Sequence, residues 1–467
     1  MTATAERSGV PSLTTTITLK LRQPARLRNV ELPLLLFAIG MIVGAMALVE
    51  LGAQGSIDAG MLGLVAGLGV LGLVGHVILR VSAPEADPFL LPIALLLNGI
   101  GIAEISRLDI AADRNGWDAF GVKQIVWSGM AMVIAFAVLV AFRNHRILQR
   151  YRYIAMFTGL VLLLLPMLPG IGQTVNGARV WIRLAGFSFQ PGELAKIALA
   201  VFFAGYLVTA RDSLSMVGRT FLGMRFPRVR DLGPILVIWA SSMVVLVFQR
   251  DLGTSLLYFG LFLVMIYVAT ARLSWVLLGL ALFVGGALAA SRLLTYVQGR
   301  FQGWLDAFSP QVYNRQGGSY QLVQGIFGMA DGGLVGTGLG QGRPQVTPLA
   351  YSDFIVASLG EELGLIGLFA IIGLYLLLVS RGFRIGFNGQ DDFGRLLGVG
   401  LSFVIALQVF IVVGGVTRVI PLTGLTTPVL AAGGSSLVAN WIIVVLLLRL
   451  SDTVRAHPRL VLEGSGP

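Results

Sequence analysis

Residues 234–290 read PILVIWASSMVVLVFQRDLGTSLLYFGLFLVMIYVATARLSWVLLGLALFVGGALAA, and only Arg250, Asp251 and Arg272 interrupt this apolar run with charge. A helix needs about 20 apolar residues to cross roughly 30 Å of hydrocarbon, so the run is long enough for more than two crossings. The charged positions divide it into segments. We therefore expect three consecutive membrane-spanning helices, near 232–249, 253–271 and 273–291.

The rest of the chain has the same composition. Of its 467 residues, 56% are hydrophobic and 12% are charged, against about 25% charged in a soluble domain. The absence of cysteine excludes disulfide scaffolds and thiolate metal sites. We expect an all-α fold, a polytopic transmembrane bundle of about twelve helices. The other nine expected helices lie near 31–50, 58–80, 88–104, 123–142, 152–169, 191–210, 353–379, 395–416 and 428–449.

The distribution of cations predicts the orientation. With twelve helices both termini lie on one side, and the segments on that side hold most of the 34 Lys and Arg residues. The positive-inside rule places that side in the cytoplasm, so we expect a multi-pass protein of the plasma membrane with cytoplasmic termini. The net charge of +11 is then a topology signal, helped by anionic lipid, and nucleic acid is not an expected partner. The expected units are a basic tail (1–30), two N-terminal helices (31–87), a membrane core (88–450) and a cytoplasmic tail (451–467).

The loop at 292–352, on the extracytoplasmic side, is too long for a simple connection. In it Phe301, Trp304, Leu305 and Phe308 recur at helical spacing, with Asp306 on the opposite face. A second stretch repeats the pattern with Tyr320, Val323 and Phe327. Such helices lie in the membrane interface. They are suited to a substrate with a lipid tail and a polar head.

Charged residues inside or beside the spans mark candidate functional positions, because ionised groups are costly there. On the extracytoplasmic side we expect cations and acids to converge as a pyrophosphate site, since cations exceed acids in the set. The alternatives are a local ion pair and separate interfacial charges. The residues of this set are Arg179, Arg183, Glu193, Lys196, Arg250 and Asp251.

Two further stretches carry polar or glycine patterns. Asp353 opens the span 353–379, and Glu361 and Glu362 lie about two turns deeper, either as structural groups or as part of a proton path. Residues 332–342 read GGLVGTGLGQG but follow no expected strand and lack the Gly-Lys-Ser/Thr ending of a phosphate loop. We therefore expect a tight loop there and no nucleotide site.

Five of these segments occur in an order that resembles one known family. They are GARVWIRLAGFSFQPGELAKIALAVFF (177–203), FQRDLGTSLLYF (248–259), GGSYQLVQGIFGMADGGLVGTGLGQG (317–342), SDFIVASLGEELGLIG (352–367) and PLTGLTTPVLAAGGSS (421–436). The chain resembles the shape, elongation, division and sporulation (SEDS) family over residues 88–450. The resemblance implies a ten-helix core, to which 31–87 adds two helices as in longer actinobacterial members. It is closer to the elongation branch (RodA-like) than to the division branch (FtsW-like).

The resemblance implies a peptidoglycan glycosyltransferase. It would join the disaccharide-pentapeptide of lipid II to a growing strand, release undecaprenyl pyrophosphate, and work beside a class B penicillin-binding protein docked on the helices 353–379 and 395–416. Three alternatives stay open: a lipid II flippase, a division-specific polymerase, and a non-catalytic scaffold for the penicillin-binding protein. A transporter needs polar groups along a path to both faces, whereas most charges here lie toward the outer half.

The chain departs from the family at the expected base. Family members usually carry an aspartate six residues before the tyrosine of a Gly-x-Gly-Tyr-Gln segment; here that tyrosine is Tyr320 and the position holds Asn314, which cannot act as a base. We expect Asp306 to be the general base, with Asp353 or Asp331 as alternatives; a third alternative is that the chain has lost or weakened polymerase activity. The donor arrives activated, so no cofactor is required. A divalent cation, Mg²⁺ or Mn²⁺, held between acids and pyrophosphate stays open.

Overall fold

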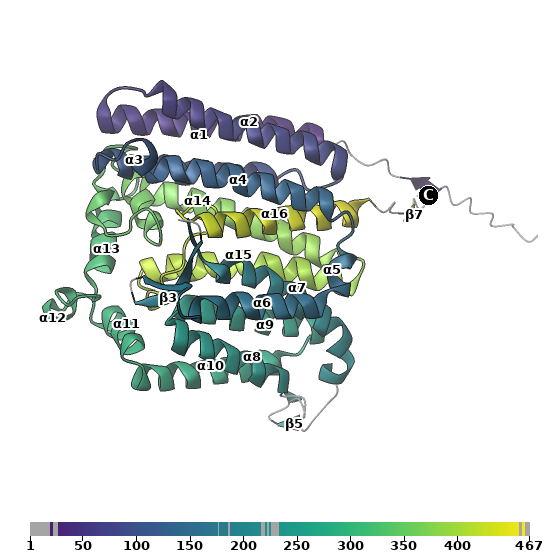
Figure 1. Cartoon of the computed structure of the whole chain (residues 1–467). Coiled ribbons are helices and arrows are strands. Elements are labelled where there is room, and N and C mark those ends of the chain that lie inside the picture. Colours follow the sequence, from purple (N-terminus) through teal and green to yellow (C-terminus); the bar gives the residue numbers. More distant parts are fainter. Residues whose placement is uncertain are drawn as a thin grey trace, which may run out of the picture.

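The chain folds as a bundle of long helices that run side by side (Figure 1). The computed structural model describes residues 19–21, 27–175, 177–184, 187–215, 220–221, 224–225, 233–456 and 460–462. Within these residues ten helices are long and apolar enough to cross a membrane. They are α1 (Leu27–Gln54), α2 (Ala59–Ser82), α3 (Leu90–Ala111), α4 (Phe120–Ala141), α7 (Pro191–Ser215), α9 (Leu252–Thr270), α10 (Leu273–Leu293), α14 (Ile355–Phe387), α15 (Asp392–Val416) and α16 (Gly434–Arg455).

The remaining two expected spans form shorter helices. Helix α6 (Arg152–Leu164) ends in a 3₁₀ turn at Leu165–Met167, where Pro166 cannot continue the helical hydrogen bonding. Helix α8 (Gly233–Val244) widens into a π turn at Val245–Gln249. The prediction of a polytopic helical bundle is confirmed.

Several helix ends differ from the expected ones. Helix α16 begins at Gly434 and not near 428, because Pro428 and Gly433, with φ of 159°, lie in an irregular segment before it. Helix α3 continues to Ala111 although it contains Glu104 and Arg107, which are buried against protein and not against lipid. A prediction from hydropathy alone ends the span at such charges. In the folded protein their buried partners allow the helix to continue.

Short elements complete the chain. Helices α11 (Thr295–Leu305), α12 (Pro310–Tyr313) and α13 (Tyr320–Gly332) lie at one end of the bundle, where β3 is also found, and α5 lies at the opposite end (Figure 1). One sheet has the antiparallel order β2-β3-β4. The elements not yet bounded are α5 (Arg146–Arg150), the 3₁₀ turns Gly116–Asp118 and Pro344–Val346, and the strands β1 (Leu19–Leu21), β2 (Gly172–Val175), β3 (Ala178–Leu184), β4 (Phe187–Phe189), β5 (Thr220–Phe221), β6 (Met224–Arg225) and β7 (Leu460–Leu462).

Burial separates central helices from peripheral ones. In the most apolar window of α3, 94% of the residues are buried, whereas the corresponding value for α1, α10 and α14 is 28%. A membrane helix that is apolar on its exposed side faces lipid or another membrane helix. Helix α3 is therefore the centre of the N-terminal half, and α1 and α10 lie at the margins.

The glycine-rich segment covers a break in α14. Gly364 has φ of 67° inside this helix, so the backbone groups around it lose their helical partners. The amides of Thr337 and Gly338 donate to the carbonyl oxygens of Glu361 and Glu362, both at 3.0 Å, and the amide of Leu365 donates to the Gly333 carbonyl at 3.0 Å. Irregular backbone within a membrane protein requires such internal partners. The segment is a tight loop, as expected from the lack of phosphate-loop features.

Helix α1 packs against this glycine-rich loop without space for side chains. A Cβ atom at Gly52 would lie 2.3 Å from the Leu339 carbonyl oxygen, and one at Gly340, where φ is 81°, would lie 2.6 Å from the Val49 carbonyl oxygen. The two backbones are therefore in direct contact. The first of the two N-terminal helices thus supports a loop of the membrane core.

We predict that Gly52→Leu destabilises the protein. Its side chain must displace the Leu339–Gly340 backbone, and overpacking of this kind costs roughly 1–3 kcal/mol. Thermal unfolding of the purified protein in detergent measures the loss. Gly44→Leu is the matched control, because nothing lies within 4 Å of a Cβ built at that position of the same helix. An unchanged melting temperature for Gly52→Leu would contradict the close packing.

Candidate functional site

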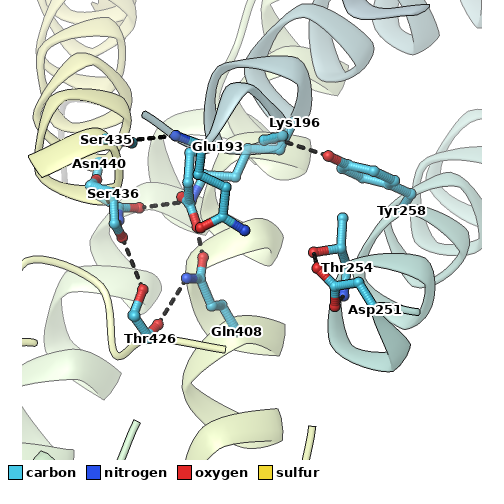
Figure 2. A network of polar contacts seen from close by, with 12 residues as sticks. Glu193, Lys196, Asp251, Thr254, Tyr258, Gln408, Thr426, Ser435, Ser436 and Asn440 are labelled. Carbon is cyan, nitrogen blue, oxygen red and sulfur yellow. Dashed lines mark hydrogen bonds and ion pairs between the residues drawn. The ribbon is translucent and has the colours of Figure 1, made fainter. Parts of the chain in front are cut away.

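The centre of the site is a buried ammonium group. Lys196 on α7 is 1% exposed, and its Nζ atom donates to Glu193 Oε2 at 2.7 Å, to Gln408 Oε1 on α15 at 2.9 Å and to Asn440 Oδ1 on α16 at 3.2 Å (Figure 2). An ammonium group has three donors, and all three are used. Glu193 and Lys196 therefore form a local ion pair, which was one of the alternatives to a pyrophosphate site. The hydrogen bonds of Lys196 also join three helices.

The partners of Lys196 continue into the segment before α16. The amide nitrogen of Gln408 donates to the Thr426 carbonyl at 2.8 Å, and that of Asn440 donates to the Ser436 carbonyl at 2.8 Å. The hydroxyls of Thr426 and Ser436 lie 3.1 Å apart. These bonds fix the stretch PLTGLTTPVLAAGGSS (421–436) between α15 and α16 (Figure 2).

Helix α9 is attached to the same region through its first turns. Asp251 is the N-cap of α9 and accepts hydrogen bonds from the amide of Thr254 at 2.9 Å and from its hydroxyl at 2.5 Å. One turn later, the Tyr258 hydroxyl donates to the Gly192 carbonyl at the start of α7, at 2.8 Å. In the structure Asp251 therefore caps the N-terminus of α9, a position at which a carboxylate is favourable.

The arginines of the expected set lie on neighbouring elements. Arg179 and Arg183 are four residues apart in β3 and so lie on one face of the strand. Arg183 and Arg250 are exposed, and Arg179 is half-buried. Strand β3 contacts α7 and the π turn that ends at Gln249. The structure thus brings Glu193 and Lys196 into contact and places the arginines on elements next to α7 and to each other, without a described contact between Lys196 and any of the three.

A second group of charges lies at the start of α11. Burial raises the pKa of Tyr296 above its usual value; Asp251 adds to this effect, whereas Arg250 and Arg300 oppose it. The first turns of α11 therefore lie beside the Arg250–Asp251 turn. Burial also raises the pKa of Asp353, again opposed by Arg300. Arg300 thus lies near both Tyr296 and Asp353, and no sequence pattern had indicated this.

The candidate bases have different surroundings. Asp306 is exposed one residue beyond the end of α11, whereas Asp353 is 9% exposed and accepts a hydrogen bond from the Ser352 hydroxyl at 3.0 Å. Asn314 follows α12 and is exposed, as is Asp331 near the end of α13. Asp306 is open to a ligand at the membrane surface, and Asp353 is covered.

Arg418 holds the end of α11 beside Asp306. Its guanidinium donates to the carbonyl oxygens of Trp304 and Leu305, both at 2.7 Å, and Trp304 Nε1 donates back to the Arg418 carbonyl at 3.0 Å. A cation at a helix C-terminus satisfies carbonyl groups that have no helical partner. The segment before α16 therefore positions both the Lys196 network and the interfacial helix, which sequence spacing could not indicate.

The two deeper acids of α14 bind the glycine-rich loop. Glu362 accepts from Arg107 Nε and from the Gly340 amide, both at 2.8 Å, and Glu361 accepts from the Arg343 amide at 2.5 Å. These bonds favour the structural interpretation of the pair over a proton path. Across the described part of the chain, no three His, Cys, Asp or Glu residues are grouped as metal ligands.

Fold and site together define a class: a polytopic membrane protein with a sealed polar network beneath one end of its bundle and exposed arginines around that end. The family model FtsW/RodA/SpoVE, described as cell cycle protein, matches residues 85–456, and the chain belongs to this family. The resemblance to the SEDS family is confirmed. The matched region leaves α1 and the whole of α2 outside.

Similar proteins support the same assignment. The peptidoglycan glycosyltransferase RodA of Mycobacterium tuberculosis is 46% identical over 446 residues, which cover 94% of each chain. Among solved structures, one chain of a peptidoglycan synthase complex studied for the coordination of polymerization and crosslinking aligns with a TM-score of 0.62 at 26% identity, over 79% of this chain and 98% of that one. The rod shape determining protein RodA of Thermus thermophilus aligns with a TM-score of 0.52 at 25% identity, over 78% and 96%.

We predict that Lys196→Met destabilises the protein by about 3 kcal/mol or more, because it leaves the Glu193 carboxylate buried without its cation. The double variant Glu193→Gln/Lys196→Met should recover part of this loss, since no buried charge remains. Melting temperatures of the three proteins in detergent form the cycle. A double variant as unstable as the sum of the single ones would show that the two residues do not act as a pair.

Proposed function

We propose that this protein is a peptidoglycan glycosyltransferase of the RodA type that polymerises lipid II into glycan strands for cell-wall elongation. The observation that carries the proposal is the 46% identity to RodA of Mycobacterium tuberculosis over nearly the whole of both chains. The geometry agrees with it. Exposed arginines and interfacial helices occupy one end of the bundle, where a lipid-linked sugar can enter from the bilayer.

The chemistry assigns a role to each candidate residue. The acceptor hydroxyl attacks the anomeric carbon of the donor, the bond to the pyrophosphate breaks, and the base takes the hydroxyl proton. Arg179, Arg183 and Arg250 bind the pyrophosphate and stabilise the negative charge that develops on it. Lys196 and Glu193 act indirectly, because they are sealed in the network and hold α7 against α15 and α16.

We assign the base role to Asp306. A base must come within hydrogen-bond reach of the hydroxyl it deprotonates, and Asp306 is exposed at the end of the interfacial helix α11, where Arg418 fixes the backbone. Asp353 is the alternative, because it lies near Arg300 of α11. A divalent cation between the acids and the pyrophosphate stays part of the proposal as an open choice of Mg²⁺ or Mn²⁺.

The orientation and the partner complete the proposal. Helices α11–α13 face the outside of the cell, and the end that carries α5 and the last turn of α16 faces the cytoplasm. A class B penicillin-binding protein docks on α14 and α15. The lipid-facing side of α14 supports this surface, since Leu365, Ile366, Phe369 and Leu376 are between 45% and 64% exposed. One of the similar structures is itself a peptidoglycan synthase complex.

We predict that purified protein, supplied with its partner and labelled lipid II, forms glycan chains, and that Asp306→Asn lowers the rate at least about 100-fold, the usual contribution of a general base. Gel separation of the labelled chains measures the rate. Asp118→Asn is the control, because Asp118 is an exposed acid in the loop between α3 and α4. Undiminished polymerisation by Asp306→Asn would remove Asp306 from the mechanism. Absence of product from the parent protein would favour the flippase or scaffold alternatives.

The pH profile separates the two candidate bases. Burial raises the pKa of Asp353, and a base works only when ionised. If Asp353 were the base, activity would therefore fall as the pH drops through this raised pKa, and Asp353→Asn would abolish activity. We predict instead that Asp353→Asn stays active and retains the acid limb of the parent's kcat/KM profile. Loss of activity in this variant, with its fold intact by melting temperature, would transfer the role to Asp353.

A further inference from the structure

One buried acid of α3 lies outside the hydrogen-bond networks described above. Glu104 is fully buried, and among the residues that the structure describes none donates a hydrogen bond to either of its carboxyl oxygens. Glu31 on α1 is equally buried, but its two oxygens bind the Arg28 guanidinium and His76 Nδ1. A buried carboxylate without such partners is strongly unfavourable. Glu104 is therefore either neutral or bound to a cation.

The charged side chains around Glu104 are mostly acids. Glu361 and Glu362 act on it from α14, which packs against α3 (Figure 1), and Arg107 acts on it from the next turn of α3. Arg107 is already engaged, because its Nε donates to Glu362 Oε1 at 2.8 Å and its Nη2 to the Gly342 carbonyl at 2.5 Å. If Glu104 were ionised, three buried carboxylates would share one guanidinium.

A proton on Glu104 removes this imbalance and also supplies a hydrogen bond. The side chains of Glu104 and Glu362 lie within hydrogen-bonding reach of each other. Two carboxylates can only accept, whereas a protonated acid has one O–H donor. Glu362 can accept this donor, since its two oxygens each use one acceptor site, on Arg107 Nε and on the Gly340 amide. A hydrogen bond from a neutral acid to a carboxylate is of the strong, charge-assisted kind.

We propose that Glu104 is a proton-binding site, in which the side chain stays protonated at neutral pH and donates to the Glu362 carboxylate. An ionised Glu104, one turn from Arg107 on the same helix, would compete for its guanidinium. Arg107 would then leave Glu362 and the Gly342 carbonyl. The proton therefore keeps the glycine-rich loop attached to α3. It is a fixed proton and not part of a path, and it does not depend on the proposed catalysis.

A metal cation fits the cluster less well than a proton. Hard cations take six or more oxygen ligands, and within the described ranges no three acidic side chains are grouped to bind one. The guanidinium of Arg107 also occupies one oxygen of Glu362. A proton needs only the two carboxyl groups.

Infrared spectroscopy of the purified protein in detergent detects the proton directly, because the C=O band of a neutral carboxyl group is separate from the bands of a carboxylate. We expect the difference spectrum between the parent and Glu104→Gln at neutral pH to contain one neutral carboxyl band. Glu31→Gln is the matched control. Glu31 is also fully buried, but its cationic partners keep it ionised, so its loss should leave the neutral carboxyl region unchanged.

Melting temperatures give a second readout. Glu104→Gln should be at least as stable as the parent at neutral pH, because its amide NH₂ group donates to Glu362 as the acid does, whereas Glu31→Gln should be less stable. As the pH rises, the unfolded chain releases a proton that the folded parent retains. The parent should therefore lose stability relative to Glu104→Gln, by up to about tenfold in the folding equilibrium constant per pH unit.

Four results would overturn the proposal. They are a difference spectrum without a neutral carboxyl band, a melting temperature of Glu104→Gln lowered as far as that of Glu31→Gln, and parallel pH profiles of the parent and Glu104→Gln. The fourth is stabilisation of the parent, but not of Glu104→Gln, by sodium or potassium ions, which would place a metal cation where we place the proton.

Discussion

The ammonium group of Lys196 determines how three helices of the site fit together. Its three hydrogen bonds join α7 to α15 and α16, and the next bonds in the network fix the segment 421–436. A buried cation is stable only when every donor is satisfied, so the positions of Glu193, Gln408 and Asn440 are tightly constrained. Leucine side chains at these three positions could fill the space between the helices, but they would not favour one arrangement of the helices over others. The network thus specifies the geometry beneath the proposed pyrophosphate site.

Two further constraints transmit this geometry to the membrane surface. Arg418 connects the segment before α16 to the end of α11, and Arg107 with Glu362 connects α3 to the glycine-rich loop and α14. Both are polar contacts between distant parts of the chain; Arg107 and Glu362 are buried, and Arg418 is half-buried. These contacts support the elements that carry the exposed residues of the proposed site, which are Arg183, Arg250 and Asp306.

Much of the fold follows from the sequence, because hydrophobic runs of membrane length have few alternatives to a spanning helix. All twelve expected helices are present in order, two of them short. The predicted positions of some helix ends were wrong, such as the C-terminal end of α3 and the N-terminal end of α16. Glu104 and Arg107 look like a span boundary until their buried partners are known, and residues 428–433 are apolar enough to extend a helix until Pro428 and Gly433 are placed.

The site was less predictable than the fold. Glu193 and Lys196 are separated by three residues, so their pairing follows from helical spacing. Gln408 and Asn440 carry no signal in the sequence, since single polar residues in apolar spans do not show which partner they meet. Arg300 and Arg418 are surface cations by composition, and only the three-dimensional arrangement gives them neighbours. The sequence shows that Asn314 replaces the aspartate usual in the family. Which residue then acts as the base depends on which carboxylate the substrate reaches.

We propose that the Lys196 network positions arginines of β3 and of the turn before α9 to hold a lipid-linked diphosphate. A cryo-electron microscopy structure of the protein with bound undecaprenyl pyrophosphate tests this most directly. We expect diphosphate oxygens within hydrogen-bond distance of at least two of Arg179, Arg183 and Arg250, with the Lys196 hydrogen bonds unchanged. A diphosphate bound elsewhere, with these three side chains in solvent, would contradict it.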